Sequence, residues 1–390
     1  MSEATKTQVA IIGAGPAGLL LSALLHKEGI DSIVFDSRSR EEIEQTIRAG
    51  ILEQGTVEIL REVGGSRVDT VGARHDGIEL RFNGVGHRID FQGLVGRSVW
   101  LYPQHEALID LIALRLEQGG DIRFGWTAIA ATDVETDSPK VLVEDPEGRR
   151  VEISADMVVG ADGSRSVIRE AVTGSLTGGY FREYPFAWFG ILCEAPPSAE
   201  ELIYSTSDRG FALISQRSPK VQRMYLQCDP EMDPESMSER EIWDELQARV
   251  GGGLKEGPIF KRDVLRFRSF VAHELRKGRA ALVGDAAHTV PPTGAKGMNL
   301  AVADVVVLNR AIQALIKEGS EALLDEYVEA VSHRIWKAQH FSWWMTSMLH
   351  SAPDATDFDE RRRIGELTSV VESQAGSTYL AEAYTGWPLA

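Results

Sequence analysis

Cysteine is scarce in this sequence, and positive charge is outnumbered by negative charge. Cys193 and Cys228 are the only cysteines among 390 residues, and because they form no C-x-x-C motif we expect free thiols in a reducing compartment and no metal site. The chain has 41 Lys and Arg residues against 58 Asp and Glu residues, and no basic stripe stands out. Since nucleic-acid binding depends on clustered positive charge, we predict no nucleic-acid partner.

Long hydrophobic runs are also missing. The apolar run at residues 305–308 is short and follows Asp304, whereas a helix that spans a bilayer needs about 20 predominantly apolar residues. Residues 1–7 are polar and lack the apolar core of a signal peptide. We therefore predict no membrane association and a cytoplasmic location.

Near its start the chain contains a strand–glycine–helix pattern. Residues 9–12 are all apolar, as in a strand buried on both faces, and Gly13, Gly15 and Gly18 follow in the G-x-G-x-x-G spacing. Gly13 permits a tight turn, Gly15 lets the backbone approach a pyrophosphate, and Gly18 lets the helix predicted at residues 17–27 lie close to the sheet. This pattern indicates a site for the phosphates of a dinucleotide.

A second strand and an acidic residue complete the unit. Residues 32–35 form the next predicted strand, and Asp36 at its end lies 18 residues past Gly18, where dinucleotide sites hold a ribose hydroxyl. A lone G-x-G-x-x-G also occurs in flexible loops, but strand, glycines, helix, strand and acid in one short unit favour dinucleotide binding. Because 390 residues are too many for one core of ordinary size, we expect further sub-domains.

Two later segments repeat the combination of a strand end, small residues and one acid. The first reads GADGSRS at residues 160–166, and the second reads GDAAH at residues 284–288. The sequence PPTGAKGMN follows at residues 291–299. Prolines and glycines at this density are costly unless the backbone must approach something closely.

These three segments together resemble the flavoprotein aromatic hydroxylases, a family of single-component monooxygenases. The similarity extends over nearly the whole chain, from residue 9 to residue 388, and the second and third segments are specific to this flavoprotein class. Between residues 180 and 270 helical periodicity is mostly lost and aromatic and β-branched residues increase, which favours an antiparallel sheet interrupted by a helix near residues 239–250. Further helices are predicted at residues 299–317 and 323–349.

The resemblance and this change of character imply an α/β fold with a Rossmann-like FAD-binding domain, an inserted, mainly antiparallel β substrate domain and a C-terminal helical region. The predicted boundaries are residues 1–179 for the first part of the FAD-binding domain, 180–270 for the substrate domain, 271–318 for the second part of the FAD-binding domain and 319–390 for the helical region.

The third segment also has a physical interpretation of its own. Gly297, Met298 and Asn299 start a long helix whose unpaired N–H groups and dipole favour an anion, which suits the negative charge on the pyrimidine side of a reduced flavin. Lys296 adds a positive charge nearby, and Asp285 can accept a hydrogen bond from a ribityl hydroxyl. The alternative is an ordinary loop that caps a helix. The further residues expected to contact FAD are Gly13, Gly15, Ala17, Gly18, Asp36, Arg48, Gln104 and Arg223.

The resemblance also implies a pocket for an aromatic acid. Arg217 matches the family's carboxylate clamp, because its planar fork fits a carboxylate bidentately, and Ser215 adds a donor. Tyr225 matches the third group of that clamp. The residues matched to the substrate site are Tyr204, Ser215, Gln216, Arg217, Tyr225, Pro292 and Thr293.

A proton relay is implied as well. By resemblance, Tyr204 hydrogen-bonds the substrate phenol, Tyr384 continues the proton path, and His75 ends it near solvent. Histidine suits this last role because its unperturbed pKa is about 6.5, although a lone histidine in a glycine-rich loop is more often just exposed. Trp188 matches a position at the pocket edge, and plain core packing explains it equally well.

The nicotinamide coenzyme is the least determined partner. Arg38 and Arg268 match contacts to a nicotinamide nucleotide, and both NADH and NADPH stay open as cosubstrates. Because negative charges repel a 2′-phosphate, we predict that NADH serves as well as or better than NADPH. A solvated helix face without a role is the alternative. The charges concerned are Glu41, Glu42 and Glu44.

The activity implied by the resemblance is hydroxylation of 4-hydroxybenzoate at position 3 with FAD, NAD(P)H and O2. Related aromatic acids, such as 4-aminobenzoate or a dihydroxybenzoate, stay open as substrates, and a homodimer is plausible by resemblance. A flavin reductase acting on an apolar substrate is a second hypothesis, against which Arg217 argues. A catalytically silent nucleotide-binding protein is a third, against which Lys296, Asn299 and the tyrosines argue.

Overall fold

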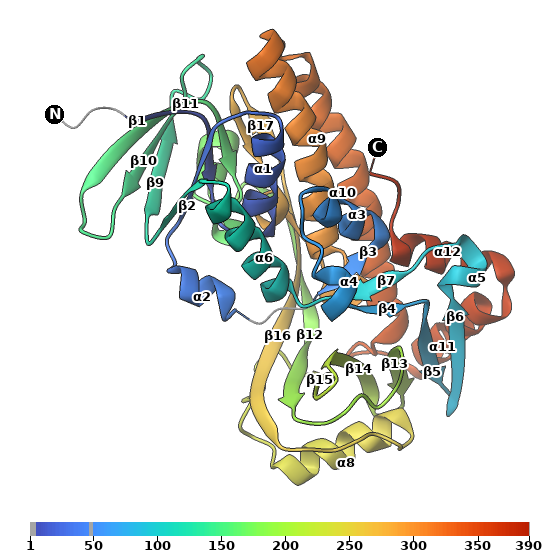
Figure 1. Cartoon of the computed structure of the whole chain (residues 1–390). Coiled ribbons are helices and arrows are strands. Elements are labelled where there is room, and N and C mark those ends of the chain that lie inside the picture. Colours follow the sequence, from blue (N-terminus) through green and yellow to red (C-terminus); the bar gives the residue numbers. More distant parts are fainter. Residues whose placement is uncertain (1–4, 47–49, 390) are drawn as a thin grey trace.

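Two eight-stranded sheets organise the structure, and helices α9 (Gly297–Glu318) and α10 (Ala322–Leu349) run side by side and connect their cores (Figure 1). The structure is a computed structural model that describes residues 5–46 and 50–389. The first half of α10 packs in the core of the first sheet through Tyr327 and Ile335, and its second half packs against the second sheet through Met345. One continuous helix therefore belongs to both cores.

The first sheet is mostly parallel and is built around β1 (Thr5–Ile12). Its strands follow the order β17-β18-β11-β1-β2-β8, and β10 and β9 extend it beside β11. Ala10 and Ile11 are fully buried, as expected for a strand covered on both faces. α1 packs against both α6 and α9. The bounds are β2 (Ser32–Asp36), β8 (Asp121–Phe124), β9 (Thr127–Thr132), β10 (Lys140–Glu144), β11 (Arg150–Gly160), β17 (Arg276–Lys277), β18 (Ala280–Leu282), α1 (Pro16–Lys27), α6 (Gln104–Glu117) and α7 (Ile168–Thr173).

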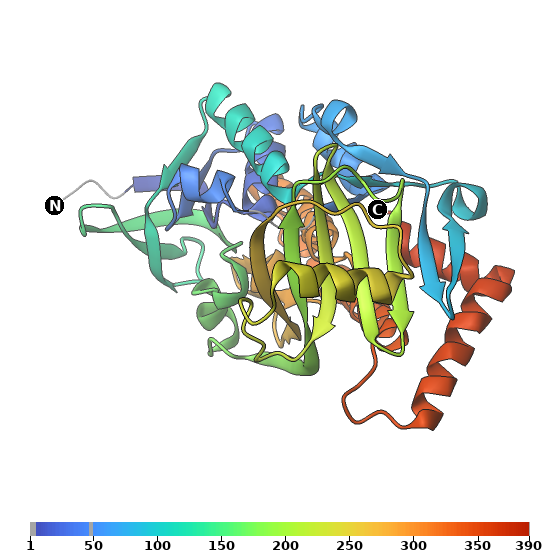
Figure 2. The same ribbon diagram turned by 90° about the horizontal axis from the view of Figure 1, so that it is seen from below.

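The second sheet is mainly antiparallel and follows the order β19-β16-β12-β15-β14-β13-β5-β6. Helix α8 (Glu239–Val250) lies across its outer face, as Figure 2 shows from below, and buries Trp243 and Leu246 there. The opposite face turns towards α10 and the C-terminal helices. The bounds are β5 (Gly77–Phe82), β6 (Val85–Asp90), β12 (Gly179–Cys193), β13 (Leu202–Ser207), β14 (Gly210–Ser218), β15 (Val221–Cys228), β16 (Ile259–Ala272) and β19 (His288–Thr289).

Three strands of this second sheet, β5, β6 and β19, come from parts of the chain that the predicted boundaries assign to the FAD-binding domain. β5 pairs in parallel with β13, with Ile78 opposite Leu202, and β6 pairs with β5 at the sheet edge. The sheet thus extends beyond the predicted segment of residues 180–270, because its edge is completed by a hairpin that precedes it by about a hundred residues in the sequence.

A third sheet has three strands in the order β3-β7-β4, and several short helices complete the two units. A capping box fixes the N-terminus of α2, since the Ser39 hydroxyl accepts from the Glu42 N–H while the Glu42 carboxylate accepts from the Ser39 N–H. The bounds are β3 (Ile51–Glu53), β4 (Ala73–His75), β7 (Val99–Leu101), α2 (Arg40–Glu44), α3 (Gln54–Glu62), α4 (Val68–Val71) and α5 (Phe91–Val95), with 3-10 turns η1 (Gly163–Arg165), η2 (Gly284–Ala286) and η3 (Pro292–Gly294).

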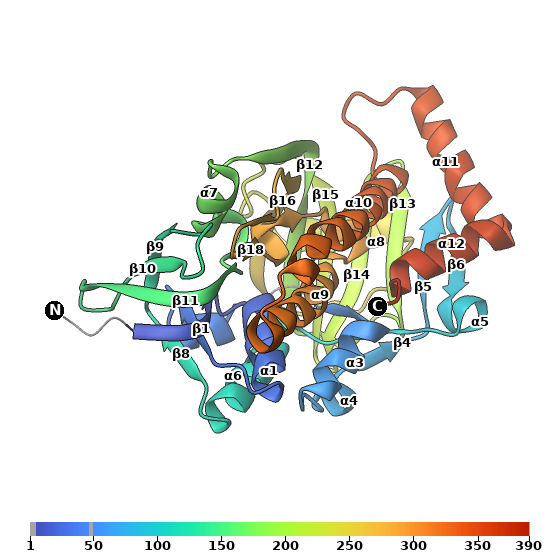
Figure 3. The same cartoon turned by 90° about the horizontal axis from the view of Figure 1, so that it is seen from above.

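The chain ends in two further helices, α11 (Asp357–Glu372) and α12 (Gln374–Thr385), which lie beside β5 and β6 (Figure 3). Side-chain caps define where they begin: Thr356 accepts from the N–H of Asp359, and Ser373 accepts from the N–H of Gly376. α12 packs on α5, which places the end of α12 against the inner face of the second sheet.

Helix α9 corrects one prediction. By length and composition Gly297–Glu318 is sufficient to cross a membrane, so the expectation that the chain has no such stretch is wrong on these two criteria. However, 78% of the most apolar 18-residue stretch of α9 is buried inside the protein, and Val305 and Leu308 are fully buried in the core of the first sheet. The core helix of a globular protein has this pattern.

Candidate active site

The glycine turn after β1 has the predicted tight geometry. Gly13 adopts a φ of +110°, and its N–H donates to the carbonyl of Phe35 at 2.6 Å. A Cβ at Gly13 would collide with the backbone of Ala161, and a Cβ at Gly18 would collide with the backbone of Gly13, so both positions require glycine. At Gly15 a Cβ would meet no atom closer than 4.0 Å, which leaves this backbone approachable.

Asp36 ends β2 as predicted, and its carboxylate is already engaged. It accepts from the backbone N–H of Ala14 at 2.8 Å and from two guanidinium nitrogens of Arg38 at 2.9 and 2.8 Å. This contact anchors the glycine turn to β2 directly. Arg38, which we matched to a nicotinamide nucleotide, is thus the ion-pair partner of Asp36, and its pKa is raised by that hydrogen bond.

The third segment lies against the same turn. Gly284 adopts a φ of +60°, and a Cβ there would stand 3.5 Å from Ala17 and 3.1 Å from Ala301 of α9. The Asp304 carboxylate accepts from the Gly284 N–H at 2.9 Å and lies 2.6 Å from Nε2 of His288, which fixes the turn that carries Asp285. The three segments are therefore brought together at the ends of β1, β11 and β18.

Asn299, predicted to contact the cofactor from the helix start, uses its side chain within the protein. Its Oδ1 accepts from the Glu53 N–H at 2.9 Å and from the Thr56 hydroxyl at 2.8 Å. Its Nδ2 donates to the carbonyls of Ile51 and Ala295, both at 2.9 Å. The amide is saturated and fastens α9 to β3, while a Cβ at the preceding Gly297 would meet nothing within 4 Å. Met298 is half-buried beside it.

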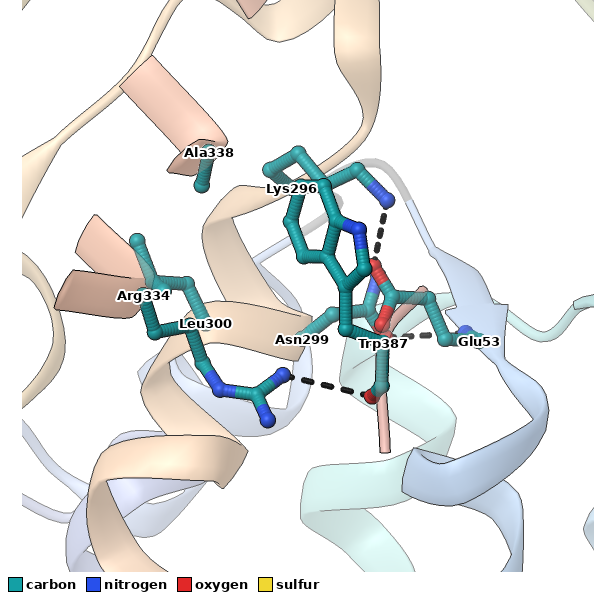
Figure 4. A pocket seen from close by; sticks show the side chains of 7 residues that line it. All are labelled: Glu53, Lys296, Asn299, Leu300, Arg334, Ala338 and Trp387. Carbon is teal, nitrogen blue, oxygen red and sulfur yellow. Dashed lines mark hydrogen bonds and ion pairs between the residues drawn. The ribbon is translucent and has the colours of Figure 1, made fainter. Parts of the chain in front are cut away.

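Lys296 forms a buried ion pair that the sequence did not indicate (Figure 4). Its Nζ lies 2.5 Å from Oε1 of Glu53 and donates to the carbonyl of Tyr384 at 3.0 Å, and its side chain is 2% exposed. Burial lowers the pKa of Lys296, and the Glu53 carboxylate opposes this shift. The positive charge that we predicted near a flavin is thus compensated by Glu53 and also holds the end of α12.

The segment Gly386–Leu389, which we call the C-terminal strap, covers this ion pair. Figure 4 shows Trp387 of the strap beside the Lys296–Glu53 pair, and the Trp387 ring centroid is 5.5 Å from the Lys296 ammonium. The Arg334 guanidinium donates to the carbonyl of Trp387 at 3.3 Å and to that of the next residue, Pro388. A cavity of only about 10 Å³ remains beneath the strap, too small to admit bulk water.

Gly386→Ala should destabilise the protein by about 2 to 4 kcal/mol, because a methyl group there would collide with the Glu53 carboxylate at a φ of +94°. Thermal or urea unfolding measures the change. Gly319→Ala is the matched control, since Gly319 also has a positive φ but a Cβ there would meet nothing within 4 Å. Equal losses for both variants would contradict the close packing of the strap.

The predicted substrate residues share one face of the second sheet. In the strand register Tyr204 of β13 lies opposite Leu213 of β14, which lies opposite Tyr225 of β15, and Tyr225 lies opposite Gly190 of β12. Paired residues in an antiparallel ladder point to the same side, and residues two apart share it. Ser215, which lies opposite Arg223, is therefore on this face too. Arg217 falls at a register shift between Gln216 and Ser218, and its interaction with Tyr225 places it beside these residues.

Arg217 is a half-buried cation without a carboxylate partner among residues 5–46 and 50–389. Its Nε is buried and lacks a hydrogen bond in this part of the chain. Burial lowers the pKa of Arg217, Tyr225 opposes that shift, and Arg223 adds like-charge repulsion. Such a group needs an anion to compensate its charge.

Arg223, predicted to lie beside the flavin ring, has its own counter-ion. Its Nη2 lies 2.5 Å from Oδ1 of Asp263, and its guanidinium carbon lies 4.8 Å from the Tyr225 ring centroid. Gly190 makes room for this pair, because a Cβ there would stand 2.8 Å from both charged groups. Of the two neighbouring arginines, Arg217 is thus the one left for an external carboxylate.

Tyr204 and Tyr384 meet as the relay requires. Their hydroxyl oxygens lie 2.6 Å apart, and the Tyr204 hydroxyl also lies 3.4 Å from the carbonyl of Thr293. Both side chains are 1% exposed, and burial raises the pKa of each phenol above its ordinary value. The pair is neutral at physiological pH and can shift a proton along the hydrogen bond.

His75 departs from the prediction. It is 2% exposed and so does not end a relay near solvent, because β7 and the neighbouring strands cover it. Its Nε2 lies 3.1 Å from the Gln216 amide, and burial lowers its pKa. His75 therefore contacts the clamp segment through Gln216, and its Nδ1 is buried without a partner in the described chain.

The remaining predicted residues lie around this centre. Gln104 begins α6, and the neighbouring His105 is close enough to Arg217 for the two charges to repel. Arg268 donates to the hydroxyl of Ser164 at 2.7 Å, which places this predicted nicotinamide contact at the second segment. Pro292 is half-buried in η3. Arg48 lies outside the described residues.

Four residues that matter to this site carried no sequence signal. Glu53 and Asp263 are single acids in ordinary context, and only the fold brings them to Lys296 and Arg223. Thr346 and His350 lie on and just after α10, and their partners are more than 50 residues away. Trp188 was predicted at the pocket edge, and it is 2% exposed with its ring centroid 4.7 Å from that of Tyr225.

The arrangement pairs an uncompensated cation with a buried hydroxyl chain on one sheet face. Arg217 offers a fixed fork for a carboxylate, and Tyr204 offers a hydroxyl with a path to Tyr384. A planar molecule with a carboxylate at one end and an acidic hydroxyl at the other fits these two groups.

Comparison with known proteins supports the sequence-based resemblance. The family model described as an FAD binding domain matches residues 6–342. The p-hydroxybenzoate hydroxylase of Acinetobacter baylyi is 41% identical over 396 aligned positions, which cover 99% of this chain and 96% of that protein. The 3-(3-hydroxy-phenyl)propionate/3-hydroxycinnamic acid hydroxylase of Paraburkholderia xenovorans is 26% identical, and the alignment covers 83% of this chain and 53% of that protein.

A solved structure agrees at the level of the fold. The p-nitrophenol 4-monooxygenase of Pseudomonas putida superposes with a TM-score of 0.80 at 19% sequence identity, covering 98% of this chain and 99% of that chain. The combination of parallel sheet, antiparallel sheet and C-terminal helices is therefore shared over the full length.

Proposed function

Since the chain belongs to the FAD-binding family of flavoprotein aromatic hydroxylases, we propose that it hydroxylates 4-hydroxybenzoate at position 3. The overall reaction is 4-hydroxybenzoate + NAD(P)H + H⁺ + O2 → 3,4-dihydroxybenzoate + NAD(P)⁺ + H2O. The observation that carries the proposal is the placement of uncompensated Arg217 and the Tyr204–Tyr384 hydroxyl pair on one face of the second sheet.

The residues at the three glycine-rich segments fit FAD. A Cβ would meet nothing within 4 Å at Gly163 and Gly297, and none closer than 4.0 Å at Gly15, so these backbones are open to a bound group. Gly15 would face the pyrophosphate, and the start of α9 would face the flavin ring. FAD supplies, when bound, the redox chemistry that activates O2.

Arg217 orients the substrate. A carboxylate held bidentately by a planar guanidinium has a fixed direction, so the aromatic ring projects from Arg217 along one line. This direction decides which ring carbon is presented for hydroxylation. Tyr225 and Ser215, on the same face, confine the carboxylate end.

Tyr204 and Tyr384 prepare the substrate hydroxyl. A free phenol has a pKa near 10, so it is mostly protonated at neutral pH and its ring is not activated. The Tyr204 hydroxyl accepts a hydrogen bond from the substrate phenol and donates one to the Tyr384 hydroxyl. Both tyrosines stay neutral because burial raises the pKa of each side chain. The phenolic proton can therefore be passed through the Tyr204 hydroxyl to Tyr384 rather than to a charged base.

The proposal is tested with the FAD-loaded protein and a panel of hydroxybenzoates, benzoate and 4-aminobenzoate. We expect 4-hydroxybenzoate to give one 3,4-dihydroxybenzoate per O2 and per reduced coenzyme consumed. Coenzyme oxidation without O2 uptake would instead indicate a flavin reductase. A purified protein that stays colourless after reconstitution with FAD would contradict any flavin function.

NADH should be used as well as or better than NADPH. The two arginines of residues 37–44, the segment that carries Arg38 and the three glutamates, are both engaged by carboxylates, Arg38 by Asp36 at 2.8 Å and Arg40 by Glu44 at 2.6 Å. Neither is left for a 2′-phosphate, and the nearby glutamates repel one. The ratio of kcat/KM for the two coenzymes measures the preference.

Glu44→Gln releases Arg40 and should raise kcat/KM for NADPH a few-fold while leaving that for NADH unchanged. Glu62→Gln is the control, since it breaks a comparable exposed ion pair with Lys27. A strong NADPH preference of the unaltered protein would refute the prediction.

We further propose that the enzyme acts in the cytoplasm, consistent with two free cysteines, and forms a homodimer, which rests on the family resemblance. Sedimentation at several protein concentrations tests the dimer.

A further inference from the structure

His350 is a buried titratable residue that the proposed reaction does not use. It caps the C-terminus of α10, is 3% exposed and lies among aromatic rings. The Phe186 ring is parallel to the imidazole within 4° at 4.8 Å between centroids, and the Phe211 ring centroid is 4.3 Å away. A histidine that only filled this space would be replaceable by an apolar side chain of similar size.

Its two hydrogen bonds fix one tautomer. The Trp188 indole N–H is only a donor and lies 2.7 Å from Nε2 of His350, so Nε2 must accept. The Thr346 carbonyl is only an acceptor and lies 2.9 Å from Nδ1, so Nδ1 must carry the proton. A second proton would set two N–H groups against each other, and burial accordingly lowers the pKa of His350 to about 3.

The imidazole joins the two ends of the proposed substrate site. On one side Trp188 packs against Tyr225, which lies beside the Arg217 clamp. On the other side the Thr346 hydroxyl is 2.9 Å from that of Thr293, whose carbonyl faces the Tyr204 hydroxyl. Tyr225 belongs to the sheet, as Tyr204 does, whereas Thr293 and Thr346, which lie at the hydroxyl end, belong to η3 and α10. His350 is one of the polar contacts that join the sheet to α10.

We propose that His350 is a positioning residue that fixes the distance between the carboxylate-binding end and the hydroxyl-binding end of the substrate site. This inference rests on the proposed function. It predicts that His350 discriminates ligands by whether they engage both ends, although it contacts neither end itself.

The test compares two ligands on the FAD-loaded protein without coenzyme, by the absorbance change of the bound flavin. 4-Hydroxybenzoate engages both ends, whereas benzoate lacks the hydroxyl. His350→Leu removes both hydrogen bonds, and we expect the Kd of 4-hydroxybenzoate to rise about tenfold and that of benzoate to rise less than about twofold. His350→Gln, whose amide has both a donor and an acceptor, should recover part of the loss.

Trp188→Phe keeps an aromatic ring against Tyr225 and removes only the indole donor, so it carries the test if the leucine variant fails to fold. It should change the ratio of the two Kd values in the same direction. In the double variant with His350→Leu the losses in binding free energy should be clearly less than additive, because both substitutions remove the same hydrogen bond between Trp188 and His350.

Equal losses for both ligands, or losses that only follow the melting temperature, would overturn the positioning role and leave His350 as core packing. Failure of the unaltered protein to bind either ligand would instead refute the proposed function, so the two failures are distinguishable.

Discussion

Arg217→Ala is expected to raise the Kd of 4-hydroxybenzoate by roughly a hundredfold, with FAD binding unchanged. A charge-assisted, bidentate hydrogen bond contributes about 2 to 3 kcal/mol, and Arg217 is the cation of the sheet face without a carboxylate partner in the described chain. Titration of the FAD-loaded protein with substrate measures the change.

Two variants make this result specific. Arg217→Lys keeps the positive charge but lacks the planar guanidinium. The Kd of 4-hydroxybenzoate for this variant should therefore lie between the values for the unaltered protein and the alanine variant. Asp263→Asn leaves Arg217 in place and releases Arg223 from its counter-ion, so it should not weaken substrate binding. If the alanine variant binds nearly as tightly as the unaltered protein, the carboxylate is held elsewhere.

Tyr204→Phe is expected to retain FAD and substrate but to lower the hydroxylation rate about 10² to 10³-fold at neutral pH, the range that positioned proton transfer contributes. The variant lacks the Tyr204 hydroxyl, which connects the substrate to Tyr384 and whose oxygen lies 2.6 Å from the Tyr384 hydroxyl oxygen. Coenzyme and O2 should still be consumed, and the product should change from dihydroxybenzoate to hydrogen peroxide. Product and peroxide assays on the same sample measure this uncoupling.

The hydroxylation rate of Tyr204→Phe should also change with pH in a definite direction. Without Tyr204 the substrate must ionise by itself, so the residual hydroxylation should rise with pH towards the phenol's pKa near 10. In the unaltered protein the profile should be flatter, because the relay removes the proton. Tyr384→Phe should show the same trend more weakly, since Tyr204 can still donate to the Thr293 carbonyl. Unchanged coupling in Tyr204→Phe would exclude it from the relay.

Local pattern was sufficient to predict much of the fold. The helices α1, α8, α9 and α10 are where the sequence placed them, to within two residues, and β1 ends at the predicted residue but begins four residues earlier. These elements depend on neighbours in the sequence: apolar periodicity, a capping side chain, or a glycine that permits a turn. The register of the antiparallel sheet places Tyr204, Tyr225 and Ser215 on one face, whereas Arg217 follows a register shift that the sequence does not indicate.

What escaped prediction depends on pairings between distant residues. The edge hairpin β5–β6 joins a sheet whose other strands begin at Gly179, and nothing in the sequence of the hairpin indicates that it pairs with β13. His75 lies in a glycine-rich stretch that looks exposed, and only the fold covers it. Lys296 meets a carboxylate 243 positions earlier, so its charge appeared free for a ligand when it is already paired.

The order of strands in the first sheet has a consequence for biosynthesis. β11 is flanked by β1 on one side and, over residues 158–160, by β18 on the other, and β18 comes after every strand of the second sheet except β19. A ribosome releases these strands in sequence, so an emerging chain waits for residue 282 before the C-terminal end of β11 has both neighbours, and until then Val158 and Val159 lie at an unpaired edge. Fragments that stop short of β18 should accordingly aggregate rather than bind flavin, and a version of the enzyme split before β18 should work only when both pieces are made together.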